Sequence, residues 1–132
     1  MIAGLAALTV NFILVSCRKD SSSNIPDPTV DRKFSFQLYT SQDFSNDNSV
    51  IHFSIFIRTA NKTLFDSAFA SMQIKDIPDA LHKLVIEKTV AANANSDLAA
   101  GFNYEIESVG NSWHVDTSKA GNLFKVIDYN FQ

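Results

Sequence analysis

The sequence has only one cysteine, four glycines and three prolines in its 132 residues. A single thiol excludes an intramolecular disulfide and any metal site built from several thiolates. The low glycine and proline content argues against a collagen-like or a Pro/Gly-rich disordered chain. An excess of positive charge is also missing, because 11 Lys and Arg are set against 14 Asp and Glu. A mildly acidic chain offers phosphates no basic surface, so nucleic acid is not an expected partner.

Phenylalanine, in contrast, is abundant. The chain has 11 of these residues, which indicates a packed apolar core. Its length allows one domain and leaves little room for a second. The composition also changes along the chain, because residues 1–16 carry no charge and the first charged residue is Arg18. We therefore treat residues 1–16, 17–29 and 30–132 as separate segments.

Residues 1–16 have the apolar character of a secretory signal peptide, and they are too short to span a hydrocarbon core about 30 Å thick as a helix. Small side chains next to a cleavage site admit a signal peptidase, and a cysteine thiol can carry diacylglycerol. The sequence Leu14, Val15, Ser16, Cys17 resembles the lipobox of bacterial lipoproteins. This resemblance implies that Cys17 becomes the lipidated first residue of the mature chain, held to a membrane by its acyl chains.

Residues 17–29 are polar and contain two prolines, which is typical of a flexible tether. Within it, Lys19 and Asp20 resemble the start of the surface-export signal of Bacteroidetes lipoproteins. The whole chain is similar in plan to small Bacteroidetes lipoproteins, in which a lipobox and a short tether precede one β-sandwich. The resemblance implies anchoring in the outer membrane, either on its periplasmic side or exposed at the surface.

Residues 30–132 show alternating apolar and polar side chains, the period of a half-buried strand. The clearest runs are 34–39, 51–58 and 102–107, and further strands are predicted at 70–74, 83–91, 113–116 and 123–131. About seven short strands separated by turns predict an all-β domain. We expect an antiparallel β-sandwich of the immunoglobulin-like or transthyretin-like kind. A small β-barrel is the alternative.

Two segments decide details of this fold. Residues 79–92 fit either a helix capped by Asp79 or a turn followed by a strand, and their β-branched residues favour the strand. Further along, the pair Gly110-Asn111 predicts a turn. In the strand that follows, Trp113 and Val115 form the apolar set, whereas His114 falls in the polar set.

No catalytic motif stands out, because the sequence contains neither a P-loop nor a G-x-S-x-G pattern. The histidines His52, His82 and His114 show no spacing typical of metal ligands. We therefore expect no cofactor, no metal and no enzymatic activity. A small hydrolase is the least favoured alternative, and it requires a cleft in which His52 or His114 meets a carboxylate.

Aromatic residues remain as functional candidates, because exposed rings can stack on sugars or anchor a partner. Trp113 and Phe44 are the predicted contacts to a ligand or glycan. The sequence Asp66-Ser67-Ala68 is similar to the O-glycosylation acceptor of exported Bacteroidetes proteins, which implies a sugar on Ser67. The favoured function is a lipid-anchored, non-catalytic binding or interaction module whose partner is an envelope protein or a glycan. The alternative is a glycan-binding accessory lipoprotein of a polysaccharide-uptake system.

Overall fold

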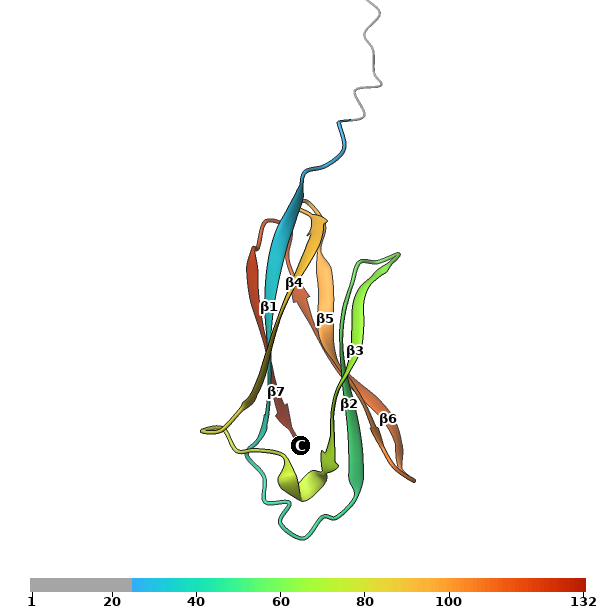
Figure 1. The fold of residues 1–132 in the computed structure, drawn as a ribbon, viewed down its shortest axis with the longest axis vertical. Helices are drawn as coiled ribbons and strands as arrows, with labels where there is room; N and C mark the ends of the chain where they lie inside the picture. Colours follow the sequence, from blue (N-terminus) through green and yellow to red (C-terminus); the bar gives the residue numbers. More distant parts are fainter. Residues whose placement is uncertain (1–24) are drawn as a thin grey trace, which may run out of the picture.

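The computed structural model describes residues 25–132, which form seven strands and a short 3-10 helix (Figure 1). The strands are β1 (Thr29–Thr40), β2 (Val50–Arg58), β3 (Thr63–Gln73), β4 (Leu84–Asn93), β5 (Leu98–Ile106), β6 (Gly110–Ser118) and β7 (Phe124–Phe131). The helix η1 (Ile74–Asp76) follows β3. The predicted signal peptide, the lipobox residues Leu14, Val15 and Ser16, and the lipidation site Cys17 lie outside the described residues. Within the described range, no helix has the length and apolar character needed to cross a membrane.

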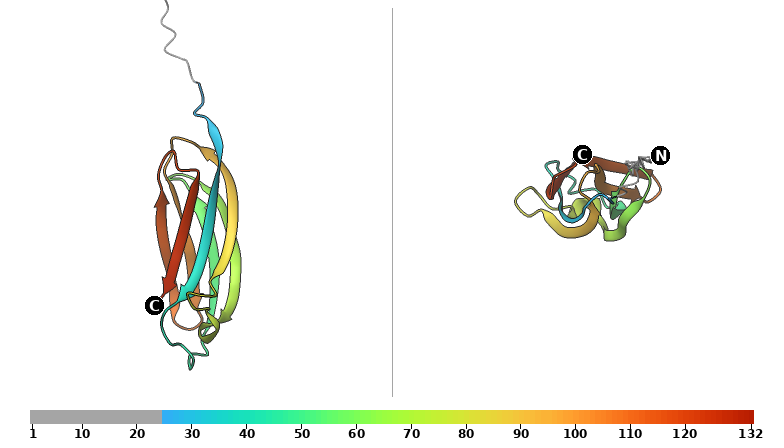
Figure 2. Two further views of the ribbon diagram at one scale, coloured as in Figure 1. Left: turned by 90° about the vertical axis from the view of Figure 1, so that its left-hand side faces the viewer. Right: turned by 90° about the horizontal axis from the view of Figure 1, so that it is seen from above.

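The strands form two sheets that pack face to face (Figure 2). One sheet has the order β4-β1-β7 and the other β3-β2-β5-β6. Neighbouring strands are antiparallel except for β1 and β7, which run parallel. The predicted β-sandwich is confirmed, and the two separate sheets are not the barrel of the alternative. In immunoglobulin constant domains the first strand pairs with the second, whereas here β1 pairs with β4 and β7.

The core is built from inward-facing side chains of both sheets and is rich in aromatic rings. Alternate positions of β1 are fully buried at Phe34, Phe36 and Leu38, because every second side chain of a strand faces inward. The ring of Phe102 lies at the centre of the aromatic cluster. Its neighbours, at centroid separations of 5.6 to 6.4 Å, are Phe36, Phe53, Phe69 and Tyr129. Most of the phenylalanines among the described residues therefore lie in or against the core between the sheets, whereas Phe56 and Phe124 do not.

Two strands settle the less regular parts of the sequence. The turn and strand predicted within residues 79–92 are confirmed by β4, which begins at Leu84. Strand β3 is longer than predicted and begins at Thr63. Its register shifts where Phe53 pairs with Ala70 and the next residue pairs with Ala68, so Phe69 is the extra residue of a bulge. A bulge interrupts the period of two, which explains why the alternation before residue 70 is irregular.

Arg32 connects the loops at one end of the sandwich. Its side chain faces inward from β1 and is only 1% exposed. The guanidinium donates hydrogen bonds to the carbonyls of Ser96, Ser118, Lys119 and Asn122 and to the Ser118 hydroxyl. Removal from water lowers the pKa of Arg32, but arginine stays charged at neutral pH. The β4–β5 and β6–β7 connections are thereby fixed beside the start of β1 (Figure 1).

Candidate functional site

Strand β6 turns its apolar side chains to solvent. Trp113 is 69% exposed and Val115 is 37% exposed. His114 is the direct partner of Phe102, which is buried in the core, and directly paired residues lie on the same face of a sheet. The predicted faces of this strand are therefore wrong, since His114 faces the sandwich interior and Trp113 faces outward.

The inward side chains of β6 contact β7 across the side of the sandwich. The imidazole of His114 stacks on the ring of Tyr129, with centroids 4.5 Å apart and planes 12° apart. The carboxylate of Asp116 lies 2.9 Å from Lys125 Nζ. The hydrogen bond from Lys125 lowers the pKa of Asp116, and burial, together with Tyr104, raises the pKa of the Tyr129 phenol. His114 and Asp116 are thus both held against β7.

The outward side chains of the four-stranded sheet form rows across β3, β2, β5 and β6, in that order, as defined by the strand registers. The His52 row contains Ser71, His52, Glu105 and Asn111. The Trp113 row contains Ala68, Ser54, Asn103 and Trp113. The Phe56 row contains Asp66, Phe56, Gly101 and Val115. The Arg58 row contains Thr63, Arg58, Ala99 and Thr117.

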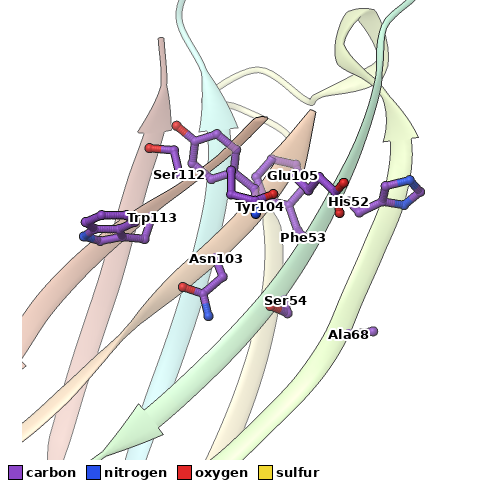
Figure 3. A pocket seen from close by; sticks show the side chains of 10 residues that line it. His52, Phe53, Ser54, Ala68, Asn103, Tyr104, Glu105, Ser112 and Trp113 are labelled. Atoms are coloured by element: carbon purple, nitrogen blue, oxygen red, sulfur yellow. The ribbon is translucent and has the colours of Figure 1, made fainter. Parts of the chain in front are cut away.

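A shallow hollow of about 430 Å³ lies over the Trp113 and His52 rows. Figure 3 shows Trp113 at one end, with Asn103, Ser54 and Ala68 following one another across the sheet. These three side chains are much shorter than the indole, so Trp113 forms a wall at the end of the hollow. The arrangement combines one large aromatic face with an amide and a hydroxyl, a combination suited to binding a small polar molecule.

A second hollow of about 340 Å³ adjoins the first. It is lined by Phe56, Arg58, Asn103, Trp113 and Val115. Phe56 points outward but is only 4% exposed, and the guanidinium of Arg58 lies over its ring, 4.8 Å from the centroid. The residue that pairs with Phe56 on β5 is Gly101, which has no side chain. Within residues 25–132 no carboxylate lies within ion-pair distance of Arg58. The two hollows share Trp113 and Asn103 and are therefore continuous.

His52 joins Ser71 and Glu107 in a chain of hydrogen bonds beside the first hollow. Its Nδ1 lies 2.7 Å from Ser71 Oγ, and its Nε2 lies 2.9 Å from Glu107 Oε1. This is the contact between a histidine and a carboxylate that the hydrolase alternative requires. The side chains of His52 and Glu107 are 43% and 56% exposed, however, so water reaches the group from the open face of the sheet.

The other predicted site residues lie elsewhere. Phe44, in the loop between β1 and β2, is partly buried and packs 5.5 Å from the core ring of Phe131, so the structure does not bring it to Trp113. Ser67 is exposed on the edge strand β3, and its glycosylation stays a prediction. His82 is hydrogen-bonded to Asp79 in the turn before β4. In the part of the chain that the structure describes, no three side chains of metal-ligating type are grouped to hold an ion.

Comparison of the chain with models of protein families, with curated proteins and with solved structures finds no match.

Proposed function

We propose that this protein is a non-catalytic binding module of the bacterial cell envelope, anchored in the outer membrane by lipid on Cys17. Its ligand surface is the outer face of the sheet β3-β2-β5-β6. The observation that carries the proposal is the exposed indole of Trp113 beside a hollow. Leaving a large apolar side chain in water forgoes about 1.5–3 kcal/mol of burial free energy. A ligand that covers Trp113 recovers this contribution, and tryptophan is enriched among the residues that dominate binding.

A glycan-binding accessory lipoprotein of a polysaccharide-uptake system is the narrower candidate within this proposal. A sugar ring has an apolar C–H face and a rim of hydroxyl groups. Trp113 offers a surface for the C–H face, and the side chains of Asn103 and Ser54 offer hydrogen-bonding groups beside it. Their common row across the sheet is the observation that favours a carbohydrate over an apolar ligand.

The lipid anchor is tested by the intact mass of the protein extracted from envelopes of a host with lipoprotein-processing enzymes. We expect the mass of residues 17–132 plus acyl chains, because the lipobox resemblance implies cleavage before Cys17. The Cys17→Ser variant is expected to lose the acyl mass and to leave the membrane fraction, since serine has no thiol. The control Ser21→Ala is expected to behave as the wild type. An unlipidated wild-type protein, or a Cys17→Ser variant that still sediments with membranes, would contradict the anchor.

The absence of catalysis is tested with a fluorophosphonate, which labels activated serines. We expect no adduct on Ser71 under conditions that label chymotrypsin completely. A nucleophilic serine needs a base together with preorganised oxyanion donors in a water-excluded site, whereas His52 and Glu107 are open to solvent. An adduct on the wild type that disappears in Ser71→Ala would instead identify a hydrolase.

A further inference from the structure

We propose that the outer-face ligand surface, whose existence rests on the function proposed above, binds an acidic oligosaccharide. One sugar stacks on Trp113, and a carboxylate or sulfate group further along the saccharide pairs with Arg58.

The two hollows give this ligand a continuous path. They meet at Trp113 and Asn103, and on β2 the Trp113 and Arg58 rows are four residue steps apart, from Ser54 to Arg58. At about 3.3 Å per residue this separation is about 13 Å. A single sugar ring is too short to span it. An oligosaccharide therefore fits the path better than a single sugar.

The sizes and the edges of the path favour a saccharide over a protein partner. The hollows of about 430 and 340 Å³ lie within the range of small-molecule sites. On one side of the Trp113 row lies a polar row with His52 and Glu105. On the other side lie the partly exposed Val115, the ring of Phe56 covered by Arg58, and Asp66 at the β3 edge. A ligand that lies along Trp113 thus meets hydrogen-bonding groups on one edge and the apolar side chain of Val115 on the other, which matches the two kinds of surface on a sugar ring.

The position of one cation, Arg58, on the path favours an acidic ligand. Arg58 is the one charged side chain among the described residues that line the second hollow. Its guanidinium is held against the ring of Phe56, so less freedom is lost when it forms a further contact. The acidic Glu105 borders the opposite hollow. An anion is therefore attracted to the Arg58 end, and the planar guanidinium is suited to pair with a carboxylate or sulfate through two hydrogen bonds.

The test uses the full chain on an array of pectin fragments, glycosaminoglycans, sulfated mucin glycans, neutral glucans and mannans. We expect the bound spots to be carboxylated or sulfated oligosaccharides, and the carboxylated and sulfated sets to show which group is used. Arg58→Gln is expected to weaken this binding at least about tenfold, because hydrogen bonds to charged groups are the stronger ones. Trp113→Ala is expected to weaken it by a similar factor.

Two matched variants serve as controls. Lys75→Gln removes an exposed cation at the other end of the molecule, in η1. Phe124→Ala removes a ring that is 54% exposed on β7, in the other sheet. Both are expected to bind as the wild type does.

The outcomes separate the two proposals. The proposal of an acidic ligand is overturned if the protein binds neutral glycans, or if Arg58→Gln binds acidic glycans as tightly as the wild type does. In either case the ligand surface itself is still supported if Trp113→Ala lowers the binding. Binding that Trp113→Ala and Phe124→Ala leave equally intact overturns the ligand surface itself. If no spot on the array is bound, the saccharide proposal is overturned.

Discussion

The Arg32→Met variant is expected to lose about 3 kcal/mol of unfolding free energy or more, because each hydrogen bond to a charged group contributes about 1.5–3 kcal/mol. The five hydrogen bonds of the Arg32 guanidinium end on oxygens of the β4–β5 and β6–β7 connections and of Ser118, the last residue of β6. Methionine is apolar and unbranched but donates no hydrogen bond, so these acceptors lose their buried partner. Because a domain has only about 5–15 kcal/mol of stability, we expect the variant to be close to unfolding at physiological temperature.

Chemical denaturation measures this loss, with Lys33→Met as the matched control. Lys33 is adjacent in sequence but lies on the exposed side of β1, where its Nζ is 2.9 Å from Glu87. A surface ion pair of this kind contributes about 0–1 kcal/mol. Arg32→Lys keeps the charge but lacks the planar fork, so an intermediate loss is expected. Similar losses in Arg32→Met and Lys33→Met would contradict the role given to the buried guanidinium.

The Arg32 contacts also bear on the ligand surface. Ser118, which accepts two of the hydrogen bonds, is the last residue of β6 and follows Thr117 of the Arg58 row. Fixing this end of β6 therefore fixes one border of the surface. A domain weakened at Arg32 is expected to lose ligand binding through the position of β6, even though Arg32 itself is buried.

The faces of most strands could be predicted from the sequence, but the face of β6 could not. A turn centred on Gly110-Asn111 would pair Ile106 with Val115 and place Trp113 inward. In the structure Ile106 pairs with Gly110, and Ser108 adopts a φ of 63° within the turn. Because side chains alternate with a period of two, this shift of the turn exchanges the faces of the whole strand. Serine rarely adopts positive φ, so its residue type does not mark the turn.

The candidate site was predictable only in part. Trp113 was singled out from its residue type as an exposed aromatic, and the structure places it on the surface. Asn103 and Arg58 were not, because they become neighbours of Trp113 only through the order β2-β5-β6, which short-range patterns do not determine. One signal was present in β2. Phe56 is the apolar residue in the otherwise polar set of that strand. In the structure its ring lies beneath the guanidinium of Arg58.

Gly101→Ala is expected to destabilise the domain by about 3 kcal/mol, the upper part of the usual range for overpacking. Its φ is not positive, so alanine would be preferred over glycine by about 0.5–1 kcal/mol on backbone grounds alone. The contacts reverse this sign. An added Cβ would overlap the carbonyl oxygen of His114 and lie 3.0 Å from the Cα of Val115. Both are backbone atoms, so β6 has to move away from β5.

This displacement would occur between His114 and Val115, next to Trp113 in the ligand surface. We therefore expect Gly101→Ala to lower both the unfolding free energy and glycan binding, measured by denaturation and on the array. Ala99→Ser adds one heavy atom at the preceding outward position of β5 and is expected to change stability by about 0.5 kcal/mol or less. A stabilised Gly101→Ala variant with unchanged binding would show that β6 is not held at this distance, and that close packing of β5 and β6 is not what positions Trp113.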